Sequence, residues 1–277
     1  MKKIFSCWIL VLFCIGCGPR LSVAEKGKIQ DQDTWVYVKG KLLEEGDLRI
    51  WEDRSYLPLA CLEKNLGEDF SAERHGEEIT LKDQARNVQM RVGQTWVEIN
   101  GKKKEISAAP RKEGEVIFIP IRAFAETFEM EIHWDQENRV ILLSRYGGQK
   151  STEGDQVQFH LKNRRWTIRM SPGLQERILC EEGKDNVTFY DQYNRTRAED
   201  GSSGALLYLV QGKSPSTIIA PGILLDHHEG TYTEAVFESG VEYSQASKEF
   251  FEQYKKSRDL LVEALKTFEW KEDGQSS

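Results

Sequence analysis

The sequence predicts an α+β protein in which an export signal precedes two folded regions. Three observations lead to this prediction. Short runs of alternating apolar and polar residues indicate strands with one buried face. Amphipathic helices are expected directly after Pro58 and Pro120, and a longer one over residues 243–268. The first two belong to a tandem repeat within residues 34–145, and the third closes a second α+β sandwich over residues 156–270.

The composition of the 277-residue chain is that of a globular protein. Its 7 tryptophans, 9 tyrosines and 12 phenylalanines exceed what a disordered chain carries. A net charge of −7 speaks against a general nucleic-acid-binding protein, which needs a basic face. The sequence contains no nucleotide-binding glycine motif. We therefore expect no nucleic-acid partner and no cofactor, and membrane contact only through the N-terminal segment.

The N-terminal segment has the features of an export signal. Two lysines precede an apolar run over residues 4–15, which is too short to span a bilayer but fits the apolar part of a secretory signal peptide. Small residues predict cleavage after Ala24, so that residues 1–24 are removed and the protein is secreted or held at the cell surface. Alternatively, the sequence around Cys17 resembles a bacterial lipobox, and Cys17 would then carry a lipid anchor. An uncleaved anchor is the third possibility.

Cleavage after Ala24 leaves only Cys61 and Cys180 in the chain. One disulfide is possible in an oxidising compartment, but the sequence does not require it. Cys61 falls in an apolar helical pattern, so we expect it to be a small core residue.

An internal repeat organises the first folded region. Residues 36–41 match residues 97–102 at an offset of 61, and the offset is 62 through the strand, proline and helix that follow. A nearly constant offset indicates a duplicated unit, with copies at about 36–81 and 97–143. In each copy a proline begins the helix, because its missing N–H would be unpaired there in any case.

The second copy carries, in order, Asn100-Gly101, Pro120, Arg122, Glu126, Trp134-Asp135 and Val140. This series resembles the copper amine oxidase N-terminal-like domain of secreted bacterial proteins. The first copy is less complete, because Ala60 stands where the second copy has its arginine. In copper amine oxidases this domain is a stalk outside the catalytic machinery. The resemblance therefore implies a stalk or binding role for residues 34–145.

Amine oxidase activity is not implied by this resemblance. A catalytic domain would need a quinone-forming tyrosine after an asparagine, and Tyr190 follows a phenylalanine. It would also need three histidine copper ligands, and the chain has only five histidines in all. We predict a protein without catalytic residues. The candidate ligand contacts are Arg122, Trp134 and Asp135, with the alternative that Arg122 only pairs with Asp135 or Glu126 or packs its stem on Trp134.

The second half is predicted to be a separate domain. Residues 146–155 are polar and contain glycine, so we interpret them as a linker. Strand-like runs follow, and the helical pattern over residues 243–268 predicts one long helix or two joined near Ser257. The order of these elements is weakly similar to a PsbP/Mog1-like α+β sandwich.

The sequence Asp226-His227-His228-Glu229 is the most metal-like cluster, because imidazole and carboxylate groups suit zinc or copper. A metal site needs three or four convergent ligands, however, and neighbouring residues on a strand point to opposite faces. We therefore predict a solvated loop without a metal site, and keep His227 and His228 as weak candidates for metal ligands.

These observations favour a non-enzymatic bacterial envelope protein that binds or scaffolds at the cell surface or wall. The expected partner is a cell-wall polymer or an envelope protein, and Trp35, Trp51 and Trp96 are candidates for stacking on sugars. One alternative is an envelope hydrolase that acts on cell-wall polymer with carboxylates of residues 156–270. Another is a metal-handling protein that uses the two neighbouring histidines.

Overall fold

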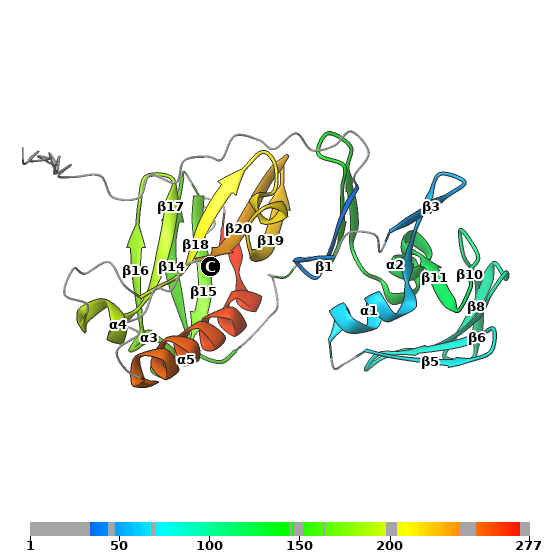
Figure 1. Ribbon diagram of the computed structural model, residues 1–277, viewed down its shortest axis with the longest axis horizontal. Coiled ribbons are helices and arrows are strands. Elements are labelled where there is room, and N and C mark those ends of the chain that lie inside the picture. Colours follow the sequence, from blue (N-terminus) through cyan, green and yellow to red (C-terminus); the bar gives the residue numbers. More distant parts are fainter. Residues whose placement is uncertain are drawn as a thin grey trace, which may run out of the picture. The chain divides into compact units, whose positions relative to one another are not determined.

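The computed structural model describes residues 34–43, 48–67, 70–144, 146, 152–162, 164–197, 204–238 and 248–271. All of them belong to one compact unit of the chain, Thr34–Ser277. The predicted signal peptide, with Cys17, lies outside the described residues. The described part is rich in sheet, with few helices and a long C-terminal helix (Figure 1), and it confirms the α+β class. No helix in this part has both the length and the apolar composition needed to cross a membrane.

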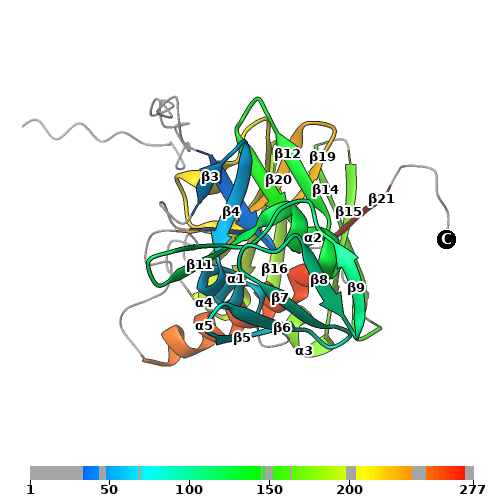
Figure 2. The same cartoon turned by 90° about the vertical axis from the view of Figure 1, so that its right-hand side faces the viewer.

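The first folded region consists of three sheets and two short helices. Its sheets have the strand orders β12-β13-β1-β2, β10-β11-β4-β3 and β5-β6-β7-β8-β9, and Figure 2 shows the last of these. The bounds are Trp35–Val38 (β1), Lys41–Leu42 (β2), Arg49–Trp51 (β3), Arg54–Pro58 (β4), Leu59–Leu66 (α1), Ser71–His75 (β5), Glu78–Lys82 (β6), Asn87–Arg91 (β7), Trp96–Ile99 (β8), Lys102–Glu105 (β9), Arg111–Glu113 (β10), Val116–Pro120 (β11), Ile121–Phe128 (α2), Ile132–Asp135 (β12) and Val140–Leu143 (β13).

Both short helices begin directly after a proline, as the sequence predicts. Pro58 precedes α1 and Pro120 precedes α2. Helix α1 ends at Gly67, which has a positive φ of 90°. Helix α2 ends instead at Glu129, which takes the left-handed conformation although it has a side chain, and its N–H donates to the carbonyl of Ala125. Helix α2 therefore ends without a glycine.

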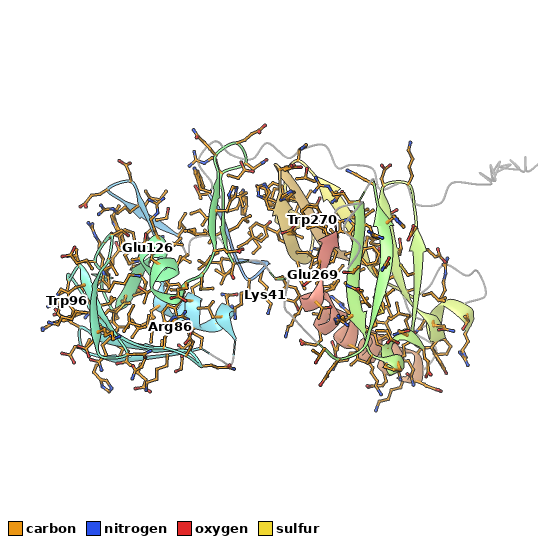
Figure 3. The ribbon with its side chains drawn as sticks, turned by 180° about the vertical axis from the view of Figure 1, so that it is seen from behind. Lys41, Arg86, Trp96, Glu126, Glu269 and Trp270 are labelled. Carbon is orange, nitrogen blue, oxygen red and sulfur yellow. The ribbon has the colours of Figure 1, made fainter. Side chains whose placement is uncertain are left out.

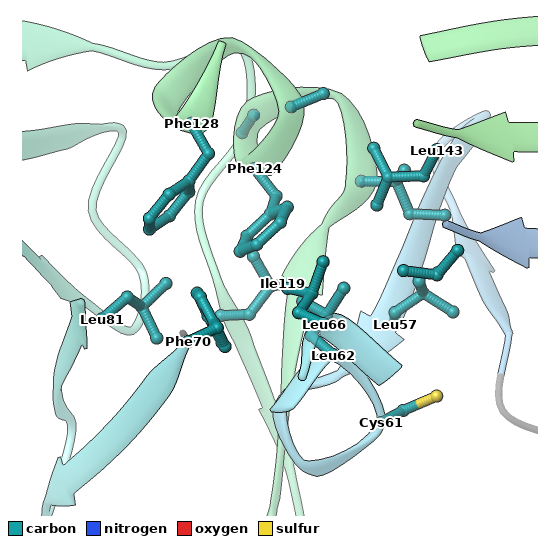
Figure 4. Close-up of a cluster of buried hydrophobic side chains, with 14 of the residues drawn as sticks. Leu57, Cys61, Leu62, Leu66, Phe70, Leu81, Ile119, Phe124, Phe128 and Leu143 are labelled. Atoms are coloured by element: carbon teal, nitrogen blue, oxygen red, sulfur yellow. The ribbon is translucent and has the colours of Figure 1, made fainter. Parts of the chain in front are cut away.

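A hydrophobic core lies between these two helices and the sheets (Figure 4). The ring centroids of Phe124 and Phe128 are 4.7 Å apart, and the Phe70 ring packs edge-on at 5.7 Å from Phe124. Cys61 is buried in this core, as predicted, whereas Cys180 is exposed. Both cysteines are free, so no disulfide joins them.

Strand β1 is buried on both of its faces. Val36 and Val38 belong to the first core, whereas Tyr37 points the other way and packs with Leu224 and Tyr232 of the C-terminal half. The strand pairs in parallel with β13. A strand of a parallel pair that is covered on both faces needs a continuous apolar run, which explains its sequence Trp-Val-Tyr-Val.

The order of elements from β1 to β6 recurs from β8 to β13, with β7 between the two series. Leu57 of β4 pairs with Ile119 of β11, and these are the two residues that the 62-residue offset makes equivalent. The flanking pairs are Pro58 with Phe118 and Tyr56 with Pro120, and the same offset of 62 converts one pair into the other. The sheet β10-β11-β4-β3 therefore has a local twofold character centred on the Leu57–Ile119 pair.

The C-terminal half has a three-stranded sheet, β14-β15-β21, and a five-stranded sheet, β16-β17-β18-β20-β19. The bounds are Asp155–Leu161 (β14), Arg164–Met170 (β15), Pro172–Gln175 (α3), Ile178–Glu182 (β16), Asn186–Asp191 (β17), Gln192–Arg197 (α4), Ala205–Gly212 (β18), Ser216–Ile218 (η1), Gly222–His228 (β19), Thr231–Phe237 (β20), Lys248–Ala264 (α5), Leu265–Thr267 (η2) and Glu269–Lys271 (β21). The predicted loop at His227 and His228 is wrong, because both residues end strand β19, where pairing with β20 keeps them extended.

Helix α5 runs without a break through Ser257 and packs on β15, β17 and β18. The fully buried carboxylate of Asp191 accepts hydrogen bonds from the Ser257 hydroxyl at 2.5 Å and from the Asn194 side chain at 2.6 Å. A buried carboxylate needs such partners to offset its lost hydration. The bond from Ser257 therefore ties α5 to β17, and the bond from Asn194 ties α4 to the same carboxylate.

Tyr146 lies at the start of the predicted linker and is 7% exposed. Its hydroxyl donates to the carbonyl of Val262 on α5 at 3.0 Å. Tyr146 is therefore packed against the C-terminal half. The predicted domain boundaries, 34–145 and 156–270 with a linker over 146–155, stay a prediction.

Candidate functional site

The three candidate ligand contacts do not converge on one point. Arg122 is exposed in the first turn of α2, and within the described residues no side-chain hydrogen bond or ion pair joins it to Asp135 or Glu126. Trp134 and Asp135 are consecutive on β12, so their side chains lie on opposite faces of the sheet. Trp134 is 46% exposed, whereas Asp135 is half-buried and hydrogen-bonded. Of the three, Arg122 and Trp134 are open to a ligand.

Asp135 joins the β12–β13 turn to the C-terminal sheet. Its carboxylate accepts hydrogen bonds from the Tyr232 hydroxyl, from the Asn138 side chain at 2.9 Å and from the Glu137 N–H at 2.9 Å. Burial alone would raise the pKa of Asp135, but the hydrogen bonds from Asn138 and Tyr232 outweigh it and lower the pKa to about 2. Asn138 also donates to the carbonyl of Lys213 at 2.9 Å. The carboxylate therefore has a structural role.

A second series of hydrogen bonds also joins the sheet β12-β13-β1-β2 to the C-terminal half. Glu234 on β20 is fully buried and accepts hydrogen bonds from the N–H groups of Ser216 at 2.6 Å and Thr217 at 3.0 Å. It also accepts from the Thr217 hydroxyl at 2.5 Å. Because that hydroxyl proton is directed to Glu234, the Tyr37 hydroxyl, 2.9 Å away, donates to Thr217. Burial is the main reason why the pKa of Tyr37 is raised.

The structure also brings together two histidines that are distant in the sequence. The ring centroids of His133 on β12 and His227 on β19 are 4.7 Å apart, and the Tyr232 ring is 4.4 Å from His227. His228 instead contacts Trp270, at 4.8 Å. The two weak metal-ligand candidates therefore have different partners. Burial, followed by the neighbouring His133, lowers the pKa of His227.

A cavity of about 200 Å³ lies beside these histidines. Its lining includes His133, His227 and His228, together with Glu131 and Asp226. Among the residues that the structure describes, no group of three or more histidine, cysteine, aspartate or glutamate side chains is arranged to hold a metal ion. The geometry assigns no ligand role to His227 or His228.

Two arginines make equivalent contacts across the sheet β10-β11-β4-β3. The guanidinium carbon of Arg49 lies 5.7 Å from the ring centroid of Phe118, and that of Arg111 lies 5.6 Å from the ring centroid of Tyr56. Both the arginines and the aromatic residues are separated by 62 positions. Trp51 packs edge-on against both rings. Sequence reasoning did not single out these arginines, although the repeat offset relates them.

The family of the first region follows from its match to known proteins. Residues 37–143 match the family model of the copper amine oxidase N-terminal domain. The resemblance seen in the motifs is therefore confirmed for this region, and residues 144–271 lie outside the match. No curated protein and no solved structure matches the chain significantly. The PsbP/Mog1-like resemblance of the C-terminal half stays a prediction.

The copper amine oxidase N-terminal-like domain has one sheet face directed away from its core, on β5 to β9. Trp96 on β8 lies on this face (Figure 3) and is 36% exposed. The ammonium group of Lys103 lies 4.3 Å from its ring centroid. Thr80, Gln89 and Glu98 lie in the same row of the sheet as Lys103. We call Trp96, Lys103, Thr80 and Gln89 the outer-face group. Of the tryptophans considered for sugar stacking, Trp96 is the most open, since Trp35 and Trp51 are half-buried.

Proposed function

We propose that this protein is a non-catalytic, exported bacterial envelope protein that binds or scaffolds at the cell surface through its copper amine oxidase N-terminal-like domain. The observation that carries the proposal is the extent of the match. Residues 37–143 correspond to the N-terminal domain alone, the part of a copper amine oxidase without the catalytic domain. The fully buried carboxylates Asp191 and Glu234 both hold structural hydrogen bonds, so these two are not candidates for the hydrolase alternative.

We further propose that this domain is a duplicated unit. The pairing of Leu57 with Ile119 supports this, and so do the matching contacts of Arg49 and Arg111. The order of strands adds support: hairpin β12–β13 lies beside β1–β2, and the equivalent hairpin β5–β6 lies beside β8–β9 with β7 inserted between them. Because Ala60 replaces the arginine in the first copy, the contact proposed for Arg122 would occur once in the domain.

The outer-face group is the surface we propose for contact with a cell-wall polymer. An indole ring offers a flat apolar surface to a sugar ring, and hydroxyl and amide side chains offer hydrogen bonds. A chain with a net charge of −7 would be repelled by an anionic polymer unless a local cation intervenes. Lys103, which stands over Trp96, supplies such a cation, and Glu98 is its cross-strand neighbour on the same face.

Export is part of the proposal, with two processing routes. In the first, cleavage after Ala24 releases the protein to the outside or to the cell surface. In the second, Cys17 becomes the lipidated N-terminus and the protein stays membrane-anchored. Intact mass measurement of the exported protein distinguishes a chain that begins at Glu25 from one that begins at a lipid-modified Cys17, and retention of residues 1–24 would contradict both routes.

Co-sedimentation with purified cell-wall sacculi tests the binding proposal. We expect the chain from Glu25 to pellet saturably at low and moderate salt. Trp96→Ala should lower the affinity for sacculi about tenfold, because a central aromatic contact commonly contributes about 1.4 kcal/mol or more to binding. Arg122→Ala tests the motif residue in the same assay, and Lys184→Gln, an exposed change in the C-terminal half, is the control. Failure to pellet would overturn wall binding, and unchanged pelleting of Trp96→Ala would overturn the chosen surface.

A further inference from the structure

An open groove lies along helix α5, apart from the surfaces described above. It has a volume of about 770 Å³ and is bounded by α5, by the adjoining ends of β19 and β20, and by Lys41 of β2. Ligand sites for small molecules commonly have volumes of about 300–1,000 Å³. The apolar side chains that line it are Ile223, Phe237, Phe251, Tyr254 and Val262.

Helix α5 has two rows of side chains with different surroundings. Tyr254, Ser257 and Leu261 are buried and face the C-terminal core or its hydrogen-bond network. Phe251, Lys255, Arg258 and Val262 follow at spacings of three or four residues and line the groove. Phe251 is 40% exposed there. A large apolar side chain is therefore left in contact with water at the groove, which favours an apolar occupant.

Arg258 has a geometry suited to an anion. Its guanidinium carbon lies 4.5 Å from the ring centroid of Phe237, so the ring positions the group by a cation–π contact. Within the described residues, no hydrogen bond or ion pair engages the guanidinium of Arg258. Among the described residues its N–H donors are therefore unengaged, and their planar arrangement fits both oxygens of a carboxylate.

The other charges at the groove strengthen this preference. Lys41 and Lys255 also line it, and neither makes an ion pair with any residue that the structure describes. Of the two acidic residues in the lining, Glu263 pairs with Lys266 at 2.6 Å, which leaves Asp259 against three cations. In a chain with a net charge of −7, this local excess of positive charge complements an anionic ligand.

We propose that this groove binds the anion of a long-chain fatty acid. The acyl chain would lie on the apolar lining beside Phe251 and Val262, and the carboxylate would meet Arg258. Each methylene removed from water would raise affinity roughly fourfold at best. This binding is independent of wall binding by the copper amine oxidase N-terminal-like domain, and it gives the C-terminal half a ligand of its own.

Isothermal titration of the chain from Glu25 with three twelve-carbon amphiphiles tests the proposal; the two ionic ones are kept below their critical micelle concentrations and dodecanol below its solubility limit. We expect dodecanoate to bind with a defined stoichiometry, dodecanol to bind about tenfold more weakly, and dodecyltrimethylammonium not to bind at the site. The tenfold figure corresponds to about one charge-assisted hydrogen bond. Equal binding of the cationic and anionic amphiphiles, or no binding of dodecanoate, would overturn the proposal.

Variants locate the site. Arg258→Gln should weaken dodecanoate binding about tenfold, Arg258→Lys less, and Phe251→Ser should weaken dodecanoate and dodecanol alike. Lys256→Gln, an exposed change on the same helix outside the groove lining, is the matched control. Thermal unfolding of each variant checks that it is folded. Unchanged dodecanoate affinity in folded Arg258→Gln and Phe251→Ser would show that the groove is not the site.

Discussion

The hydroxyl of Tyr232 donates a hydrogen bond to the carboxylate of Asp135, a residue 97 positions earlier in the chain. A second bond, between the hydroxyls of Tyr37 and Thr217, spans 180 positions. Both bonds join the sheet β12-β13-β1-β2 to β20 and its neighbour η1. The copper amine oxidase N-terminal-like domain is therefore fastened to the C-terminal half by directional bonds as well as by apolar packing.

Replacing Tyr232 with phenylalanine should destabilise the protein by about 1.5–3 kcal/mol, because a hydrogen bond to a charged acceptor is lost. Urea unfolding measures the change. Tyr193→Phe is the matched control, since it removes a hydroxyl that donates to Glu249 at the exposed surface, and it should leave the free energy of unfolding nearly unchanged. Equal effects of the two variants would show that the bond to Asp135 adds no stability.

Mild acid should lower the free energy of unfolding, because His227 takes up a proton less readily in the folded chain than in the unfolded one. Burial first, and His133 second, lower its pKa from the ordinary value of 6.5, while Asp135 and Asp226 act in the opposite direction. The unfolded chain therefore takes up this proton at a higher pH than the folded chain does. The contribution of His227 to stability is complete above pH 6.5 and decreases as the pH falls below it.

Urea unfolding at pH 7.5 and pH 5.5 checks this expectation. The loss of stability on acidification should be smaller in His227→Gln than in the unaltered protein. His75→Gln, which changes an exposed histidine on β5, should retain the full loss. Asp135 does not contribute in this range, since its lowered pKa gives stability that is lost only as the pH falls from 3.8 towards about 2. A full loss in His227→Gln would contradict the assignment.

Two equivalent turn glycines should respond differently to alanine. Gly40 and Gly101 both have positive φ, at 72° and 80°. A Cβ on Gly101 meets nothing within 4 Å, so Gly101→Ala should cost about 1–2 kcal/mol for the left-handed conformation alone. A Cβ on Gly40 would lie 2.2 Å from the carbonyl oxygen of Leu224, so Gly40→Ala should cost more and loosen β19. Urea unfolding and hydrogen exchange of β19 measure both effects, and equal costs would contradict the close packing at Gly40.

Thr217→Val should destabilise the protein by about 2–3 kcal/mol, because it leaves the buried Tyr37 hydroxyl without its acceptor and removes one of the two hydrogen bonds that Glu234 Oε1 accepts from Thr217. Thr217→Ser keeps the hydroxyl and should recover most of this loss. The free energy of unfolding of both variants is the measurement. If serine is no better than valine, the methyl group of Thr217 matters and the hydrogen-bond chain does not.

Local patterns in the sequence were sufficient to predict much of the architecture. The strand periodicity, the helices after Pro58 and Pro120 and the long helix near the C-terminus depend on residues close together in the chain. The resemblance to the copper amine oxidase N-terminal domain rests on motif order and spacing, which are also visible in sequence. The loop expected at His227 and His228 failed because the polar run looks like a turn, whereas backbone pairing with β20 extends β19 through it.

The sequence by itself therefore determined the α+β class, the place of the first domain and the candidate motif of Arg122, Trp134 and Asp135. Only the tertiary structure decided that Asp135 is held by Tyr232, that His133 meets His227, and that one row of side chains on α5 lines a groove. The physical reason is the distance along the sequence over which each effect acts. Periodicity and capping depend on residues only a few positions apart. Hydrogen bonds and burial instead depend on which distant strands the folded chain brings together.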